Sequence, residues 1–196
     1  MNYDEWMKSV PPAITNDRLW TLLAYRLALF MSDIAWHDVS KLMLDPRTRS
    51  LSDQLYRAVG SIGANIAEGY SYSTGGNRAR YFEYALGSAR ESREWYYRSS
   101  YVLGTRVVTH RINLLARIIQ LLIGYIPEQR QTSLREEETN YEVDQKSPIS
   151  FEATTPDIGL SDLTSYVPMP TETDSHLHLT SDFPLATHDN PLGAPR

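Results

Sequence analysis

The chain contains no cysteine, so neither a disulfide bond nor a thiolate metal site can form. It also lacks a long apolar run. The most apolar stretch, Leu114–Ile126, is interrupted by Arg117 and Gln120 and is shorter than the roughly 20 residues that a membrane span needs. Residues 1–12 do not resemble a signal peptide, and no Asn-x-Ser/Thr glycosylation acceptor occurs. These absences predict a cytoplasmic protein with no membrane partner.

Charge is distributed unevenly along the 196 residues. Residues 1–130 hold 16 Lys and Arg against 12 Asp and Glu, a net charge of +4, whereas residues 131–196 hold 3 against 12, a net charge of −9. A basic body joined to an acidic tail is typical of proteins that contact nucleic acid or inhibit that contact themselves. A solvated tail without a partner has the same composition, so both interpretations stay open.

Apolar residues recur every three or four positions in four segments, and strand-like alternation is missing. The first predicted helix begins at residues 15–16 and ends near His37. The second begins at residues 50–52 and ends with Gly69 as the residue after its C-cap, the third runs from about 77 to 103, and the fourth ends at Pro127. The pattern predicts an all-α protein, an antiparallel up-down four-helix bundle. Its parts are a loose lead-in (1–14), the bundle (15–130) and a disordered, acidic, Ser/Thr/Pro-rich tail (131–196).

A polar stripe interrupts the second and third predicted helices. Arg57, Ser61, Asn65 and Glu68 are spaced by four, four and three residues, and Ser88 and Glu91 follow on the next helix. Such groups need partners when buried. The stripe therefore predicts a structural polar seam between these two helices or between subunits, with Arg57 pairing to Glu91. A ligand-binding site is the alternative.

Small residues form a second pattern on the second predicted helix, at positions 60, 63, 64 and 67. Glycine inside a helix costs roughly 0.5–1 kcal/mol relative to alanine. Close packing against Gly87 and Ser88 is the compensation that we expect. A phosphate cradle is the functional alternative, although neither a P-loop nor a dinucleotide fingerprint is present.

The combined motif resembles a known family. The run SIGANIAEG at 61–69, preceded by Gln54-Leu55 and Arg57-Ala58 and followed by ALGSARE at 85–91, is similar to the four-helix-bundle proteins encoded in intervening sequences of 23S ribosomal RNA genes. The resemblance covers the second and third helices and implies a homo-oligomer, a pentameric ring. It also implies a relation to the accessory variability protein of diversity-generating retroelements, a basic ring that works with a reverse transcriptase and nucleic acid.

Arginines and aromatic residues gather after the polar stripe. Residues 75–117 contain eight arginines against three glutamates, interleaved with five tyrosines and one tryptophan. This mixture suits phosphate contact and base stacking, but it is also enriched in protein interfaces. The candidate surface for nucleic acid or a partner comprises Arg78, Arg80, Arg90, Arg93, Tyr97, Arg98, Tyr101, Arg106 and Arg111.

Signatures of catalysis are missing. Di-iron bundles need two Glu-x-x-His motifs, which do not occur, and Ser61 has no nucleophile elbow. His37 and His110 are isolated near helix ends, where exposure or capping is the default. We therefore expect no catalytic residue, metal or cofactor. The expected function is a non-enzymatic oligomeric scaffold. The alternative is a nucleic-acid-binding accessory factor that contacts RNA, DNA or a polymerase-type protein and whose acidic tail competes for the basic surface.

Overall fold

The computed structural model describes residues 2–137 and 159–170, with the side chains of 132–137 left undescribed. Every regular element in these ranges is helical, which confirms the all-α prediction. The elements are α1 (Tyr3–Ser9), α2 (Pro12–Thr15), a 3-10 turn (Arg18–Thr21), α3 (Leu23–Leu42), α4 (Arg49–Tyr70), α5 (Gly75–Arg98), α6 (Ser100–Leu103), α7 (Thr105–Glu137) and α8 (Leu160–Ser165).

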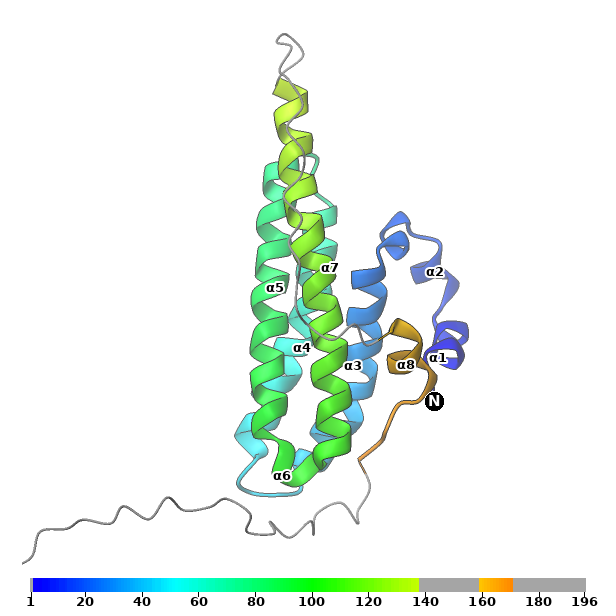
Figure 1. Ribbon diagram of the computed structural model, residues 1–196, viewed down its shortest axis with the longest axis vertical. Coiled ribbons are helices and arrows are strands. Elements are labelled where there is room, and N and C mark those ends of the chain that lie inside the picture. Colours follow the sequence, from blue (N-terminus) through cyan, green and yellow to red (C-terminus); the bar gives the residue numbers. More distant parts are fainter. Residues whose placement is uncertain (1, 138–158, 171–196) are drawn as a thin grey trace, which may run out of the picture.

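The long helices α3, α4, α5 and α7 lie side by side, and each runs opposite to the one before it (Figure 1). Helix α4 packs between α3 and α5, α5 packs between α4 and α7, and α3 also contacts α7. Their buried apolar stripes form one continuous core, whose large side chains include Phe30, Met31, Ile62, Phe82 and Tyr96.

The first long helix begins later than the sequence pattern predicts, at Leu23 rather than near residue 15. The Asp17 carboxylate accepts a hydrogen bond from the Leu19 amide, and this cap starts a short 3-10 turn instead of an α-helix. Leu22 then adopts an extended backbone, which separates the turn from α3. Asp17 therefore caps the 3-10 turn and not the first long helix, α3.

Gly69 lies inside α4 and is not the residue after its C-cap, so that prediction is wrong. A Cβ atom at Gly69 would lie 2.8 Å from the Tyr81 Cβ and 3.2 Å from the Arg78 carbonyl oxygen of α5. Glycine at this position therefore lets the two helices approach closely. The glycine with a left-handed backbone is Gly104, whose φ of 83° ends α6 before α7 begins, where the sequence predicts a break.

Helix α7 continues through Pro127 to Glu137, so the prediction that Pro127 ends it is wrong. Proline removes one backbone donor and leaves the carbonyl four residues earlier without its usual partner. That residue, Ile123, is exposed, so solvent can satisfy its carbonyl group. In Figure 1 the last turns of α7 extend beyond the α4–α5 turn.

One stretch of α7, residues 105–131, is long and apolar enough by length and composition to cross a membrane, because it contains an 18-residue window with a mean hydropathy of 1.3. Half of this window is buried within the protein, and the central helix of a water-soluble bundle meets the same criterion. Contacts with α3 and α5 account for its apolar face.

The N-terminal segment is ordered, which corrects the predicted loose lead-in of residues 1–14. The Asn2 side chain accepts from the Glu5 amide while Glu5 accepts from the Asn2 amide, so α1 begins with a capping box. Tyr3 and Trp6 are buried against Phe30 of α3, with ring centroids 5.1 and 5.2 Å away. Trp6 Nε1 also donates to Asp33, which fixes α1 on α3.

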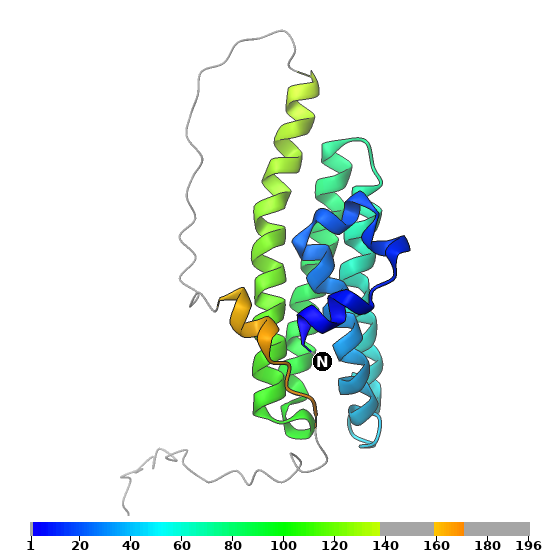
Figure 2. The same cartoon turned by 90° about the vertical axis from the view of Figure 1, so that its right-hand side faces the viewer.

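Residues 159–170 fold back onto the helices, so the predicted disordered tail needs correction in this part. Helix α8 contacts both α1 and α7 (Figure 2). Leu163 and Val167 are almost completely buried, Pro168 is buried beside them, and Leu160 and Met169 are partly buried. Burial of these apolar side chains stabilises the docked segment. The rest of the predicted tail beyond Glu137 lies outside the described residues.

Candidate functional site

Arg111, predicted to lie on an exposed basic surface, is fully buried, so that prediction is wrong. Val107 and Leu115, four residues away on either side, are buried as well, and the helical repeat therefore turns Arg111 inward. This spacing is present in the sequence and is the signal that identifies an interior arginine.

Arg111 belongs to a buried polar cluster that three helices assemble. The carboxylate of Asp38 in α3 accepts from Arg111 Nε at 2.8 Å and from Nη2 at 3.1 Å, which makes a bidentate ion pair. The hydroxyl of Tyr96 in α5 donates to the same carboxylate at 2.8 Å. Both ionic side chains have 0% exposure, so each depends on the other for compensation of its buried charge.

His110 completes the cluster and is also buried, contrary to the expected exposed or capping role. Its Nδ1 atom lies 2.9 Å from Arg111 Nη1, a group that can only donate, so Nδ1 accepts. The Nε2 atom therefore carries the hydrogen and donates to the Leu163 carbonyl oxygen at 2.8 Å. Arg111 Nη2 likewise donates to the Pro168 carbonyl at 2.9 Å.

Electrostatics favour the neutral imidazole. Burial, followed by the nearby Arg111 charge, lowers the pKa of His110 to about 4, although its bond to Leu163 and the Asp38 charge act in the opposite direction. Burial, with the Asp38 charge as the next contribution, raises the pKa of Tyr96 well above its ordinary value. Tyr96 is therefore a protonated donor and His110 an uncharged donor at neutral pH.

Acidification is expected to loosen the contact between α7 and residues 159–170. Because the docked state holds His110 with a pKa of about 4 against 6.5 for the ordinary group, docking is full above pH 6.5 and weakens as the pH falls toward 4. The total loss is at most about 3 kcal/mol. Amide exchange of Leu163 and Val167, followed between pH 7.5 and 4.5 and corrected for intrinsic rates, measures it. A His110→Gln variant should lose most of this pH dependence, and an unchanged dependence would contradict the assignment.

Five other predicted arginines are exposed: Arg80, Arg90, Arg93, Arg98 and Arg106. Their surroundings differ. Arg98 pairs with Glu94, Arg106 lies over the Tyr166 ring, and Arg80 Nε donates to the Tyr84 hydroxyl at 2.7 Å. Arg90 and Arg93 have no ion pair within the described part of the chain.

Arg78 is partly buried and has a structural role in the single chain. It donates to the Gln129 side chain in α7 at 2.7 Å and to the Tyr72 carbonyl at 2.9 Å, so it joins the α4–α5 turn to α7. The two predicted tyrosines are exposed, with Tyr97 71% and Tyr101 78% accessible.

The polar stripe of α4 forms hydrogen bonds within its own helix. Ser61 donates to the Arg57 carbonyl and Asn65 donates to the Ser61 carbonyl, both at 2.8 Å. Arg57 pairs with Asp53 rather than with the predicted Glu91. On α5, Ser88 donates to the Tyr84 carbonyl, and Glu91 accepts from the Trp95 indole.

Glu68 is the member of the stripe that reaches the next helix. The Tyr72 hydroxyl donates to the Tyr81 hydroxyl of α5, and the Glu68 carboxylate accepts from Tyr81. These hydrogen bonds, with Tyr72 and then with Glu68, raise the pKa of Tyr81 and form one contact at the α4–α5 turn. Tyr72 and Tyr81 stack with centroids 5.0 Å apart, and Tyr81 meets the edge of Tyr84. With Asn77 and Arg80 these tyrosines line a hollow of about 320 Å³. It can stack a planar ring and hold an anion.

The structure does not show the expected packing of the small residues of α4 against Gly87 and Ser88 of α5. Gly63 contacts Ala28 and Leu29 of α3. Gly60 and Gly87, however, face open space: a Cβ atom at either position would meet no described atom within 4 Å. These two glycines do not pack α4 against α5 in the single chain.

The family model for the 23S rRNA-intervening sequence protein matches residues 22–124, just over half of the chain. The chain belongs to the 23S rRNA-intervening sequence protein family. This confirms the resemblance seen in the sequence motif. Searches of curated proteins and of solved structures found no match.

The part matched to the 23S rRNA-intervening sequence protein family contains α3 to α6 and most of α7. It therefore includes the polar stripe and the buried cluster of Asp38, Tyr96, His110 and Arg111. Helices α1 and α8 lie outside it and contact each other. One N-terminal and one C-terminal element of this chain thus lie outside the matched residues 22–124, which we call the family region.

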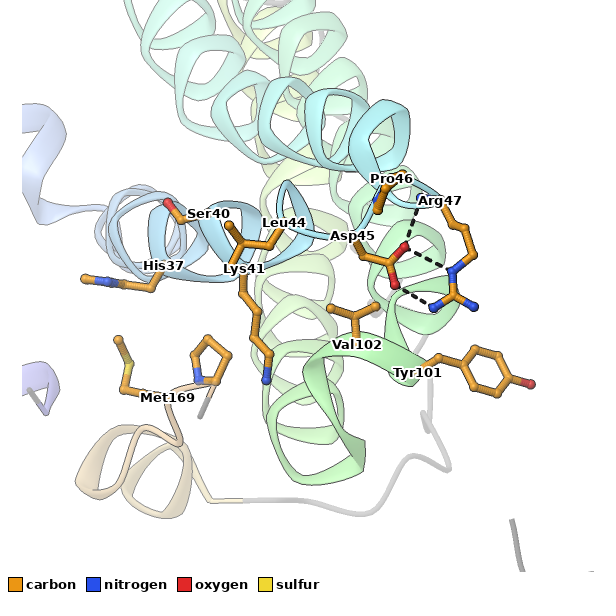
Figure 3. Close-up of a pocket in the computed structure, with 11 residues that line it drawn as sticks. His37, Ser40, Lys41, Leu44, Asp45, Pro46, Arg47, Tyr101, Val102 and Met169 are labelled. Carbon is orange, nitrogen blue, oxygen red and sulfur yellow. Dashed lines mark hydrogen bonds and ion pairs between the residues drawn. The ribbon is translucent and has the colours of Figure 1, made fainter. Parts of the chain in front are cut away.

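A larger cavity, about 1190 Å³, opens where residues 169–170 meet the family region (Figure 3). His37, Lys41 and Leu44 border it from one side, and Met169 and Pro170 from another. Arg47 at its rim is held by the Asp45 carboxylate through two side-chain bonds and one backbone bond. In the described ranges no group of three or more His, Asp or Glu side chains is arranged to hold a metal ion.

Proposed function

We propose that this protein is a non-enzymatic cytoplasmic scaffold that acts as a homo-oligomer, each copy being one antiparallel up-down four-helix bundle. Copies meet through the outer side of α4 and α5. We name this surface the α4–α5 face and define it as Tyr56, Arg57, Gly60, Ser61, Ala64, Asn65, Tyr84, Gly87, Ser88 and Glu91. Membership of the family supports the proposal, with a pentameric ring as the expected assembly.

The observation that carries the proposal is the open space around Gly60 and Gly87 in the middle of two long helices. Each glycine costs roughly 0.5–1 kcal/mol relative to alanine, and no described neighbour in the same chain uses the space that it leaves. Close approach of a second backbone offsets such a cost. Exposed Tyr56 and Tyr84 supply the aromatic area that is enriched at interfaces.

The polar stripe is compatible with this contact. The Ser61 hydroxyl proton and one of the two Asn65 amide protons are satisfied on their own helix, so burial against another copy leaves only the second Asn65 amide proton to be paired across the interface. The Asn65 carbonyl oxygen remains as an acceptor for a partner, and polar groups of this kind can fix the register of an interface.

Substituting both exposed glycines tests the proposal. We expect Gly60→Ala/Gly87→Ala to weaken association at least about tenfold, because two added methyl groups prevent close approach, while the isolated chain becomes no less stable. Sedimentation velocity over a range of concentrations measures the assembly. Gly124→Ala is the matched control, since Gly124 of α7 also faces open space. A monomeric wild-type chain, or equal association of all three proteins, would overturn the proposal.

Nucleic-acid binding is the second candidate, with a polymerase-type protein as its partner. It is favoured by the exposed stripe of Arg90, Arg93 and Tyr97, spaced by three and four residues on one side of α5. Arginines without acidic partners, next to an exposed ring, suit phosphate contact and base stacking. Under this candidate function the tail, with its net charge of −9 over residues 131–196, competes with RNA for the same surface.

Salt dependence separates this candidate from general charge attraction. For Arg90→Ala/Arg93→Ala we expect the slope of log K against log salt for single-stranded RNA to fall by roughly 1.4, the loss of two phosphate contacts. Arg18→Ala/Arg49→Ala is the control with the same net charge, made at exposed arginines elsewhere. Fluorescence anisotropy measures binding. No binding by the wild-type chain at low salt, or an equal fall in the control, would reject the candidate.

A further inference from the structure

We propose that the groove between α1 and α7, next to the buried Asp38–Arg111 pair, is a peptide-binding site. Residues 159–170 of the same chain occupy this site as a ligand that another peptide can displace. The partner that this groove fits is a short helical turn that carries one apolar residue, continued by an extended stretch that carries a second apolar residue four positions later and then proline. The inference is independent of the scaffold role, because none of its residues belongs to the α4–α5 face.

The docked segment has few anchors. Leu163 and Val167 retain 4% and 6% exposure, whereas Ser161, Asp162 and Tyr166 of the same segment are exposed. Pro168 is buried as well, and Leu160 and Met169 are partly buried against the core. These few side chains must offset the conformational entropy of about twelve ordered residues, so we expect the segment to open independently of the bundle.

The polar part of the recognition uses only main-chain carbonyl groups of the segment. His110 Nε2 donates to the Leu163 carbonyl and Arg111 Nη2 donates to the Pro168 carbonyl. Every peptide presents main-chain carbonyl groups, so these two donors can bind any peptide whose carbonyl groups lie at the right positions. The two apolar residues of the segment then determine which sequences bind.

Both walls of the groove are fixed without help from the segment. Arg111 is held from behind by the Asp38 carboxylate, and its Nη1 group in turn orients His110. On the opposite side, α1 is fixed to α3 through Tyr3 and Trp6. The donors and the apolar walls are therefore preorganised when the segment leaves, which is the property of a binding site.

The length of the connection allows docking within one chain. Helix α7 continues for 27 residues after His110, on the order of 40 Å, and residues 138–158 add 21 residues that can span up to ~70 Å. Tethering gives an effective concentration on the order of millimolar. Weak docking is thus sufficient to fill the groove, and a competing peptide of the same pattern can empty it.

The test uses full-length chains and a fluorescein-labelled synthetic peptide of residues 159–170. Leu163→Asp/Val167→Asp removes the tethered occupant, so this variant should bind the peptide at least about tenfold more tightly than wild type does in fluorescence anisotropy. A peptide with the same two substitutions is the matched control and should not bind. If the folded variant does not bind the wild-type peptide, or binds it no better than the wild-type chain does, the proposal is wrong.

Hydrogen exchange on the unmodified chain keeps the proposal testable if the double variant does not fold. Amides of residues 160–167 should exchange at least about tenfold faster than those of 114–122 in α7, because the segment opens separately. Exchange of both sets at the same rate would mean that the segment is a fixed part of the bundle and would overturn the proposal.

Discussion

Replacing Arg111 with alanine is expected to lower the free energy of unfolding by about 3–5 kcal/mol, a large effect for a single substitution. The reason is the Asp38 carboxylate, which would remain fully buried without its counter-ion. The Tyr96 hydroxyl alone would then compensate its charge. Urea unfolding at low protein concentration, followed by circular dichroism, measures the change.

A double-mutant cycle separates this explanation from simple loss of volume. Asp38→Ala/Arg111→Ala removes both charges, so its destabilisation should be clearly smaller than the sum of the two single changes. Additive single effects would contradict a coupled pair. An effect of Arg111→Ala below about 1 kcal/mol would show that water reaches the carboxylate.

Gly69→Ala is expected to destabilise the protein by about 1–3 kcal/mol, the second large effect. The added Cβ atom would lie 2.8 Å from the Tyr81 Cβ and 3.1 Å from Phe82 Cδ1, and the opposing atoms belong to a packed helix that has to move. Thermal and urea unfolding of the monomer provide the measurement.

Gly60→Ala is the matched control for this prediction, since both glycines lie in α4 and only the surroundings differ. With open space around position 60, alanine should stabilise the monomer by about 0.5–1 kcal/mol through its helix propensity. Changes of the same sign at both positions would mean that the close contact at Gly69 does not limit the packing of α4 against α5.

Periodicity predicts the helical class and the approximate extent of α4 and α5, because apolar residues recur every three or four positions along most of each helix. Periodicity does not predict the helix ends that are set by a capping side chain or by proline. Asp17 caps a 3-10 turn and not α3, and α7 passes Pro127 where an exposed turn tolerates the missing donor. The docking of residues 159–170 could not be predicted from composition either. A few apolar residues within an acidic, proline-rich stretch form no periodic pattern.

The polar residues are harder to assign from the sequence than the apolar ones. The pattern groups Arg111 with exposed arginines of the same region because arginine is rarely buried, and its partner Asp38 lies 73 positions away in the sequence. The stripe on two helices predicts an Arg57–Glu91 pair, yet Asp53 lies one turn from Arg57 on the same helix and takes that contact. A tertiary partner cannot be read from spacing within one helix.

The scaffold role depends on whether the α4–α5 face is covered by another copy, and thiol accessibility tests this most directly. Because the chain has no cysteine, a single introduced thiol gives an unambiguous signal. Ala64→Cys lies on the exposed side of α4, and Gly124→Cys lies on the exposed side of α7 as the control. With rising protein concentration, the labelling rate at position 64 should fall several-fold while that at position 124 stays constant. Equal, concentration-independent rates at both positions would contradict the account.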